Sequence, residues 1–418
     1  MIRHSLLLAG AVAICCLTIS SCAPSAPPEG NDYVLISEPS FVKVWDVQLP
    51  LHSGDSVKGI YFLDGNVHVL TSKNYDHVVK GDSGDSLYNF EIGTPENALQ
   101  GGPALVTSGI VFPTTHTLEL FDRSGNFVRS IDVKYNITNQ VIGNHNYVYF
   151  GMDFRQGCLA QVDVTQDIDA VQWEYLTGGP VDGPVGISEN VVYSGSEDGN
   201  IRACLEDKTP FWPLLTDSAF DTKSPIYSGV AVDSHSLYCS TSSGTFFCLD
   251  KNSGKLKWQY FSGQSLEFSP QVTDSAIYQY VPGLGLCALD KSKKLVLGDQ
   301  ETVDEAPFHS PKWSLRSAGR ILGEDDQYVY VVLGRPDQTR GLAAVDKQTG
   351  RIKYRTHRRD LLFVASQPKA ALIYGVTAKG LVVAIKPVSE PGSYGEIADS
   401  SAPENSAQSL DELTAHVR

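Results

Sequence analysis

Cysteine is the residue type in this chain whose number and spacing most directly predict chemistry. Cys239 and Cys248 flank the turn Ser243-Gly244, and counting outward from a two-residue hairpin places them directly opposite each other. In such a non-hydrogen-bonded pair the Cα atoms lie about 4.5 Å apart, which allows a disulfide to form. The alternative is that both side chains are small buried hydrophobes.

The body of the chain holds an odd number of cysteines, namely Cys158, Cys204, Cys239, Cys248 and Cys287. At least one thiol therefore stays free unless two chains are joined. A disulfide is expected only where the compartment is oxidising, which the start of the chain addresses below.

Three other patterns could carry catalysis or bind metal, but each has a simpler structural interpretation. The string Gly81-Asp-Ser83-Gly-Asp85 resembles the nucleophile segment of trypsin-like proteases, yet other copies of the repeat described below have a turn there. The Asp198-Gly199 pair is typical of a hairpin turn, and the spaced acids and distal Glu of a calcium loop are missing. The ten histidines show no metal-ligand spacing. The sequence therefore predicts no catalytic, cofactor-binding or metal site.

One basic segment departs from an acidic background. Its bases alternate with apolar or small residues and then continue into a loop: Arg351, Lys353, Arg355, Arg358 and Arg359. A period of two places the alternating bases on one face of an outer strand. Charges on such an edge discourage association between sheets, which is the structural interpretation. The functional hypothesis is a patch that contacts an acidic partner.

The elements that position these residues recur along the chain. An aliphatic-aromatic strand, a glycine-containing turn and a strand that ends in a small residue and an acid occur eight times between residues 41 and 388. Aromatic residues mark the copies at intervals of 37 to 52 residues, namely Phe112, Tyr149, Tyr193, Tyr238, Tyr278, Tyr330 and Tyr374, with His68 in a degenerate first copy. This length suits four short strands, and the β-branched and aromatic runs exclude a helical solenoid. We predict an all-β, eight-bladed β-propeller over residues 41–388; one miscounted weak copy would give seven blades.

The ends of the repeat region predict how the ring closes. The last copy supplies three strands and stops at Lys386-Pro387, whereas the segment around Trp45 stands alone before the first full copy. That segment is similar to the outer strands that contain Trp173 and Trp258. We therefore expect the N-terminal strand to take the fourth place in the last blade, where it pairs an otherwise open edge.

The start of the chain predicts export and anchoring. Arg3 and His4 precede an apolar run at residues 6–14 that is too short to span a bilayer and is typical of a secretory signal. The following Leu17-Thr-Ile-Ser-Ser-Cys22 resembles a bacterial lipobox, which implies a signal peptide at residues 1–21 and acylation of Cys22 with fatty acids such as palmitate. More than one acyl chain anchors stably, because each buried methylene contributes about 0.8 kcal/mol. The alternative is an ordinary cleaved signal in which Cys22 is incidental.

The regions that flank the ring have distinct compositions. Residues 22–40 are rich in proline and predict an extended, lipidated tether. Ala23 stands where Asp would be the usual cue for retention in the inner membrane, so the lipobox resemblance implies the outer membrane. Residues 389–418 carry six acids and one Arg among many Ser, Ala and Pro, which predicts a disordered acidic tail. The long step after Tyr278 indicates an insertion at residues 291–311 in the sixth or seventh blade.

The charge balance excludes one class of partner. The formal net charge is −15 at pH 7, so the surface repels nucleic acid. No segment after the signal is apolar enough to cross a bilayer. We therefore expect a membrane association that rests on the lipid anchor.

The repeat also resembles a known family. The phrase Cys-Leu-Asp250-Lys-Asn-Ser-Gly254-Lys-Leu-Lys-Trp258, echoed by Asp346-Lys-Gln-Thr-Gly350, is similar to the pyrroloquinoline-quinone-like (PQQ-like) β-propeller repeat. With a lipobox in front and eight copies behind, the chain resembles the BamB family, lipoprotein subunits of the outer-membrane β-barrel assembly machinery. The resemblance implies a non-enzymatic scaffold on the periplasmic face of the outer membrane, without a cofactor. The implied partner is the core subunit of that machinery, with this chain a monomer within the complex.

Two alternatives stay open. A PQQ-dependent dehydrogenase of this fold typically places two adjacent cysteines against the quinone, and some carry a Cys-x-x-Cys-His haem site. Here the adjacent pair Cys15-Cys16 lies in the predicted signal and Cys-x-x-Cys-His is absent, so we expect no enzyme. The other alternative is an envelope lipoprotein propeller that binds a small ligand, a polysaccharide or another envelope protein.

Overall fold

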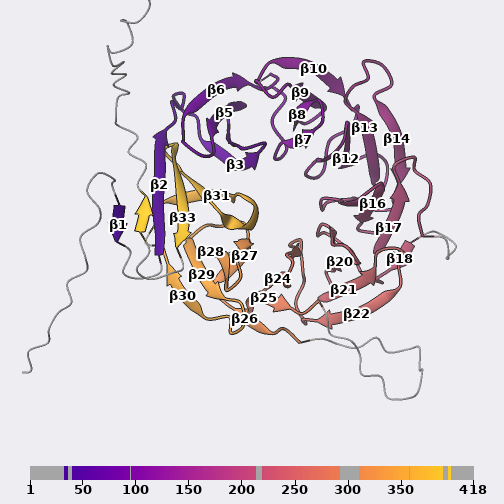
Figure 1. Cartoon of the computed structure of the whole chain (residues 1–418). Coiled ribbons are helices and arrows are strands. Elements are labelled where there is room, and N and C mark those ends of the chain that lie inside the picture. The colour runs from indigo at the N-terminus through magenta and orange to yellow at the C-terminus, as the bar shows by residue number, and fades with distance from the viewer. Residues whose placement is uncertain are drawn as a thin grey trace, which may run out of the picture.

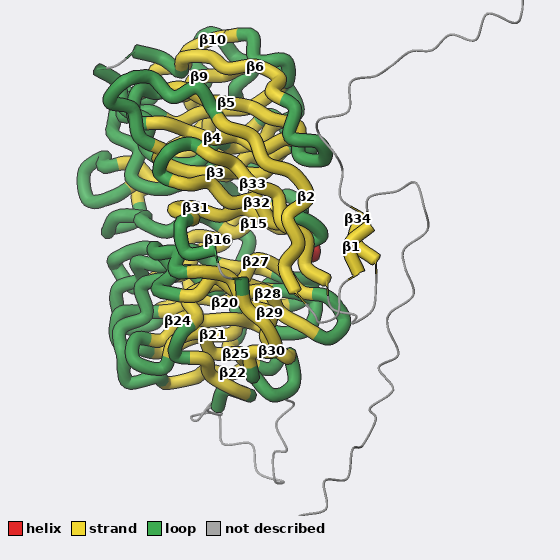
Figure 2. Tube along the Cα trace, turned by 90° about the vertical axis from the view of Figure 1, so that its left-hand side faces the viewer, coloured by secondary structure: helices red, strands yellow, loops and turns green. Residues whose placement is uncertain are grey.

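Eight four-stranded antiparallel sheets are arranged around one axis in the computed structural model, and Figure 1 shows them as a closed ring. The structure describes residues 33–35, 40–94, 96–212, 219–291, 310–356, 358–388 and 394–396. Each sheet is one blade, and the strands of blades 1 to 7 follow the chain order. The predicted all-β, eight-bladed propeller is confirmed. Seen from the side, the ring has hairpins and connections along both of its faces (Figure 2).

The strand bounds of the first four blades are as follows. Blade 1 contains β3 (Val57–Leu63), β4 (Asn66–Thr71), β5 (Tyr75–Lys80) and β6 (Ser86–Glu91). Blade 2 contains β7 (Ala104–Val106), β8 (Gly109–Pro113), β9 (Thr117–Phe121) and β10 (Phe127–Asp132). Blade 3 contains β11 (Ile142–Asn144), β12 (Tyr147–Met152), β13 (Cys158–Asp163) and β14 (Val171–Leu176). Blade 4 contains β15 (Gly186–Ser188), β16 (Val191–Gly195), β17 (Asn200–Leu205) and β18 (Ala219–Asp221).

The remaining four blades complete the ring. Blade 5 contains β19 (Ala231–Val232), β20 (Ser236–Ser240), β21 (Thr245–Asp250) and β22 (Leu256–Phe261). Blade 6 contains β23 (Gln271–Val272), β24 (Ile277–Val281), β25 (Gly285–Leu289) and β26 (Trp313–Leu315). Blade 7 contains β27 (Ala318–Glu324), β28 (Tyr328–Leu333), β29 (Gly341–Asp346) and β30 (Ile352–Arg355). Blade 8 contains β31 (Leu361–Ser366), β32 (Ile373–Thr377), β33 (Leu381–Val388) and β2 (Ser40–Gln48), with the short 3-10 helix η1 (Pro368–Ala370) between β31 and β32.

The ring closes through its N-terminal strand, as predicted. β2 pairs antiparallel with β33 from Ser40 opposite Val388 to Gln48 opposite Leu381. Because β33 would otherwise present an unpaired edge, β2 satisfies its backbone groups and joins the two ends of the propeller. In Figure 1 the indigo β2 lies beside the yellow β33.

The aromatic markers of the repeat all lie in the second strand of a blade, and Phe112, Tyr149, Tyr193, Tyr238 and Tyr374 are fully buried. In blade 5 the Tyr238 hydroxyl donates to Asp233 at 2.9 Å, and the backbone N–H groups of His235 and Ser236 donate to the same carboxylate. Burial by itself would raise the pKa of Asp233, but these donors and Lys291 lower it to about 2. The acid thus ties the inner hairpin to the buried tyrosine.

A tryptophan contact joins neighbouring blades at several junctions. The indole Nε1 of an outer-strand or near-strand tryptophan donates to a turn carbonyl of the next blade: Trp45 to Gly81 at 3.2 Å, Trp173 to Glu206 at 2.7 Å, Trp212 to Lys251 at 2.9 Å and Trp313 to Lys347 at 2.9 Å. Each accepting carbonyl lies in the turn between the third and fourth strands. Indole burial and the hydrogen bond therefore act together across the junction.

The Asp-Lys-x-x-Gly phrase of the repeat forms the receiving turn. Asp250 accepts hydrogen bonds from the backbone N–H groups of Asn252 and Ser253, and Asp346 does the same for the turn of blade 7. The last residue of the phrase has a positive φ, 69° at Gly254 and 68° at Gly350, and lies under the tryptophan of the preceding blade. The phrase is thus a structural device for joining blades.

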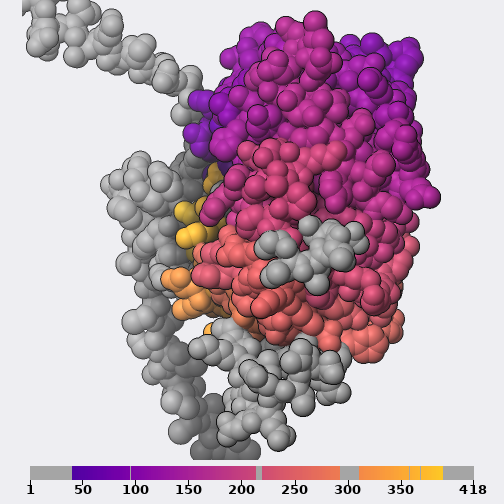
Figure 3. Space-filling model, turned by 90° about the vertical axis from the view of Figure 1, so that its right-hand side faces the viewer, coloured from indigo at the N-terminus to yellow at the C-terminus, as the bar shows by residue number. Residues whose placement is uncertain are grey.

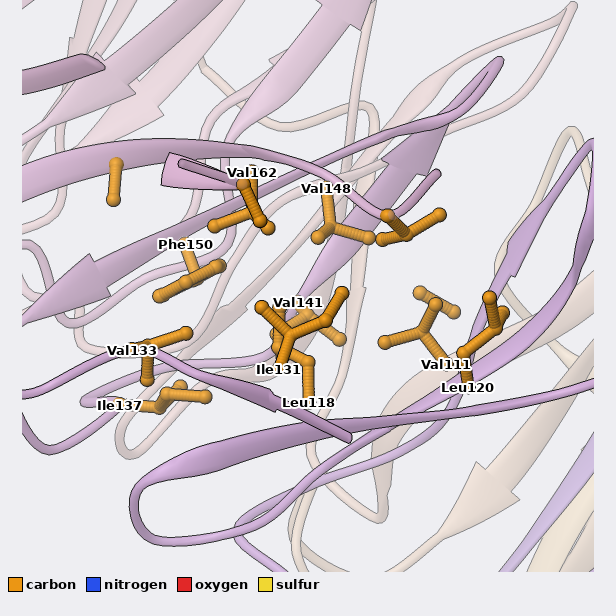
Figure 4. Packing of buried hydrophobic residues seen from close by; sticks show 14 of the residues in the cluster. Val111, Leu118, Leu120, Ile131, Val133, Ile137, Val141, Val148, Phe150 and Val162 are labelled. Atoms are coloured by element: carbon orange, nitrogen blue, oxygen red, sulfur yellow. The ribbon is translucent and has the colours of Figure 1, made fainter. Parts of the chain in front are cut away.

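The core lies between blades as well as within them. Figure 4 shows the example between blades 2 and 3, where Leu118 and Leu120 of β9 face Val148 and Phe150 of β12. All four side chains are at most 2% exposed. On the side of the ring drawn in Figure 3, the described surface is continuous from one blade to the next.

Two short strands depart from the predictions for the flanking regions. β1 (Tyr33–Leu35), in the predicted tether, pairs antiparallel with β34 (Tyr394–Glu396), in the predicted acidic tail. The two strands lie outside the ring beside β2 (Figure 2). The predicted signal at residues 1–21 lies outside the described residues. The insertion falls between β25 and β26, in blade 6, and residues 292–309 of it also lie outside the described part.

Replacing Gly350 with alanine is expected to destabilise the ring more than replacing Gly283. Both glycines have a positive φ, 68° and 85°, so alanine strains the backbone by about 1–2 kcal/mol at either position. At Gly350 the new Cβ would also lie 2.6 Å from Cγ of Trp313, whereas nothing lies within 4 Å at Gly283. Overpacking should add about 1–3 kcal/mol to the loss of unfolding free energy for Gly350→Ala. Denaturant unfolding of both variants measures the difference in unfolding free energy. Equal losses would contradict close packing of the Trp313 indole on Gly350.

Candidate interaction surface

The predicted basic segment lies on the outer edge of blade 7. Lys353 and Arg355 are exposed on β30. Ile352 and Tyr354, which alternate with them along the strand, are partly buried. Tyr354 packs against Phe41 of β2, with ring centroids 5.1 Å apart. The alternation of exposed bases and inward-facing side chains is thus confirmed for this strand.

The strict period of two is interrupted, however. Ala344 pairs with Tyr354 and Val345 with Ile352, so Lys353 is the extra residue of a β-bulge. A bulge re-aims the side chains on either side of it. The five predicted bases consequently do not form one uniform row.

The electrostatic surroundings also divide the five bases. Arg358 makes a bidentate pair with Asp360, with both N–O distances 2.8 Å, and this pair raises the pKa of Arg358. Lys353 lies 3.7 Å from a carboxylate oxygen of Asp346. Among the described residues, no acid forms an ion pair with the remaining three bases, Arg351, Arg355 and Arg359.

The structure brings two of the predicted bases into a second group that the sequence did not indicate. Arg355 and Arg359 line a cavity of about 590 Å³ together with Arg316, Arg335 and Arg340. Arg316, Arg335 and Arg340 belong to other loops and show no spacing pattern with β30. Only the fold brings them to this cavity. Arg351, Lys353 and Arg358 do not line the cavity.

Two exposed apolar side chains lie on another part of the ring and were also not predicted. Phe127 at the start of β10 is 58% exposed and Ile168, in the turn after β13, is 80% exposed. Arg129 of β10 connects the two places, because its guanidinium contacts the carbonyl of Thr165 at 2.9 Å and the carboxylate of Asp167 at 2.5 Å. Phe127 and Ile168 thus lie on chain segments that Arg129 links.

The predicted disulfide between Cys239 and Cys248 was wrong, because the register differs by one residue. Cys239 pairs with Phe247, and Cys248 pairs with Tyr238. The hairpin closes with the N–H of Thr241 on the carbonyl of Thr245, leaving a three-residue loop that ends in Gly244 at φ 89°. A three-residue loop with glycine in the left-handed region shifts the pairing expected for a two-residue loop.

The shifted register sends the two thiols to different cores. Neighbouring register positions point to opposite faces of a sheet. Cys239 packs between blades 4 and 5 with Tyr193 and Ile201, whereas Cys248 packs between blades 5 and 6 with Ile277. The alternative interpretation as small buried hydrophobes therefore describes both residues. Cys22 lies outside the described residues, and its acylation stays a prediction.

The two segments that resemble a protease nucleophile string and a calcium loop are turns, as predicted. Ser83 lies in the turn between β5 and β6, where Gly84 lies against Trp45. Asp198 lies in the hairpin between β16 and β17 and pairs with Arg202. Within the described residues, no group of three or more His, Cys, Asp and Glu could hold a metal ion. No helix in the same part of the chain has the length and hydropathy needed to cross a membrane.

All five body cysteines are expected to resist alkylation in the folded protein and to react after unfolding without reductant. Burial raises the pKa of Cys158 to about 11 and those of Cys204, Cys239, Cys248 and Cys287 to about 12. The reactive thiolate therefore forms only as pH rises toward those values, so at pH 8 the native thiols stay neutral and shielded. Mass spectrometry after alkylation, with and without denaturant, counts them. Fewer than five modified thiols in denaturant would indicate that a disulfide is present.

Known proteins are similar to this chain in sequence over part of its length and in fold over the ring. Residues 155–306 match the model of a family described as "Outer membrane protein assembly factor BamB". The ring is similar to the crystal structure of BamB from Moraxella catarrhalis, with a TM-score of 0.61 and 16% identity over 83% of this chain and 98% of that chain. It is also similar to the computationally designed Ika8 protein, with a TM-score of 0.59 and 15% identity over 83% and 99% of the two chains. No curated protein matches the sequence significantly. The chain is a BamB-like β-propeller of PQQ-like repeats.

Proposed function

We propose that this protein is a non-enzymatic, lipid-anchored scaffold that assists the assembly and insertion of outer-membrane β-barrel proteins. It acts from the periplasmic face of the outer membrane. Its partner is the core subunit of the β-barrel assembly machinery, which it joins as a single copy. The observation that carries the proposal is the match of residues 155–306, from within blade 3 to within blade 6, to the BamB family model, on a ring of the same fold.

The architecture supports a role in binding other proteins. Each blade is joined to the next by packed side chains, so the ring presents hairpins from all eight blades in a fixed arrangement. The exposed side chains of Phe127 and Ile168 offer apolar contact area, and the exposed bases Arg351 and Lys353 of blade 7 offer charge. Aromatic residues and arginine are enriched where proteins contact each other. Two separate kinds of contact surface suit a scaffold that touches more than one partner.

The anchor follows from the start of the sequence. The lipobox-like segment ending at Cys22 supports acylation there, and more than one acyl chain is needed for stable attachment. The chain from Cys22 to the first residue of β2 at Ser40 then sets how far the ring can move from the membrane. A ring held at this distance can meet membrane-bound partners without a spanning segment of its own.

The absence of an enzymatic role is supported by the sequence. The only adjacent cysteine pair, Cys15-Cys16, lies in the predicted signal, and Cys-x-x-Cys-His does not occur. The Asp and Trp positions of the repeat are used for turns and blade contacts, as at Asp250 and Trp212. The residues that define the repeat therefore have structural roles, in turns and in contacts between blades, that explain their presence.

Site-specific photo-cross-linking in intact cells tests the proposal. A photoreactive phenylalanine analogue at position 127 is expected to capture the core subunit of the β-barrel assembly machinery. The same analogue at position 261 is the matched control, because Phe127 and Phe261 are 58% and 56% exposed on outer strands on opposite sides of the ring (Figure 1). Depletion of the protein should also lower the amount of folded outer-membrane β-barrel proteins. Unchanged barrel levels, together with capture only of proteins unrelated to barrel assembly, would reject the proposal.

A further inference from the structure

A cavity of about 590 Å³ opens between blades 6 and 7. Its walls come from the hairpins β24–β25 and β28–β29, the connection from β26 to β27, and the residues at and after the end of β30. Five of the eleven lining residues are arginines, namely Arg316, Arg335, Arg340, Arg355 and Arg359, and none is acidic. Three of these four chain segments thus bring positive charge to one concave place, and the β24–β25 hairpin contributes Tyr280.

Two of the arginines are held in position. The guanidinium of Arg335 lies 3.3 Å from Asp337 and 5.9 Å from the ring centroid of Phe268. Phe268 in turn packs edge-on against Tyr280, with centroids 5.5 Å apart. Arg316 donates from Nε to the carbonyl of Gly283 at 3.1 Å. These contacts limit side-chain freedom before any ligand arrives, which lowers the entropy lost on binding.

The other three arginines lack a counter-charge. Within the described residues, Arg340, Arg355 and Arg359 form no ion pair with an acid. This concentration of uncompensated positive charge occurs in a chain whose formal net charge is −15. Like charges gathered around one cavity repel each other, so an anion placed between them lowers the electrostatic free energy.

We propose that this cavity is a binding site for a ligand that carries two or more phosphate groups. The planar guanidinium matches phosphate oxygens with paired N–H donors, which a lysine cannot do. The hydroxyl-bearing residues Thr339 and Thr356 also line the cavity, and Leu333 and Tyr280 give it an apolar part. Its volume falls within the range of roughly 300–1,000 Å³ that is usual for small-molecule sites.

A dense anion fits better than an acidic protein segment. In an extended peptide, acids on one face follow each other at about 6.7 Å, and each carboxylate carries a single charge. Such a segment would place few charges inside the cavity and leave several guanidiniums unmatched. Two neighbouring phosphate groups bring up to four charges and many acceptor oxygens into the same space. The source can be a soluble oligophosphate or the phosphorylated head group of a sugar or lipid.

Titration calorimetry on the purified full-length protein tests the site. Tripolyphosphate at roughly 0.1 M salt, where exposed charges are screened within about 10 Å, is expected to bind with 1:1 stoichiometry. The double variant Arg340→Gln/Arg355→Gln should bind at least about tenfold more weakly, because charge-assisted hydrogen bonds are lost. The matched control is Arg351→Gln/Lys353→Gln, which removes the same charge from the same edge but outside the cavity. Its affinity should stay within about twofold, since distant surface charges contribute little.

Three further probes identify the source and complete the test. Binding of glucose 1,6-bisphosphate supports a soluble ligand. Binding only to vesicles that contain phosphatidylinositol 4-phosphate, whose head group carries two phosphate groups, and not to pure phosphatidylcholine vesicles, supports a lipid head group. Melting temperatures of both double variants within a few degrees of the unsubstituted protein keep the comparison valid, and Arg359→Gln alone replaces the cavity variant if it unfolds. Equal weakening in both variants, no saturable binding of any phosphate probe, or tighter binding of a glutamate oligomer than of tripolyphosphate would overturn the proposal.

Discussion

The contact between a tryptophan of one blade and the following blade's turn is the interaction on which the ring depends. Trp212 and Trp313 each lie on a glycine of positive φ and donate their indole N–H to the carbonyl three residues before it. A side chain at Gly254 or Gly350 would occupy the place of the indole, so turn and tryptophan form one unit. A four-stranded blade alone buries too little apolar surface to be stable, and stability comes from stacking neighbours around a closed circle. The pairing of β2 with β33 closes that circle and makes every junction depend on all the others.

Closure of the ring also decides where charge and apolar surface gather. The whole chain is acidic, yet arginines from three segments meet between blades 6 and 7. Because salt screens charges over about 8 Å at physiological ionic strength, the local field of such a cavity can oppose that of the surrounding surface. Strand β10, which carries the exposed Phe127, lies on the other side of the axis, so the rigid ring keeps the two places apart (Figure 1). A scaffold with separated contact surfaces can hold two different molecules in a fixed relation.

The cysteine pair shows how far sequence spacing can be trusted. Cys239 and Cys248 were assigned to facing positions on the assumption of a two-residue loop, and one additional loop residue moved them to opposite faces. Loop length depends on backbone conformation at Gly244, which the residue type permits but does not dictate. The bulge at Lys353 had the same effect on the basic strand, since one unpaired residue ends a period of two. Local insertions of this kind arise from packing against neighbouring strands and leave no separate mark in the sequence.

The propeller fold, eight blades and the closing strand could be predicted from the sequence, with seven blades left open, because each repeat carries its own strand pattern, turn phrase and buried aromatic residue. These features are local, so they can be recognised in each repeat without information about the neighbouring blades. Which bases share a cavity, in contrast, depends on how the blades are arranged in space. Arg316 and Arg355 are 39 residues apart and belong to different blades, and no period connects them. Their meeting follows from the angle at which one blade packs on the next, which is set by the whole ring.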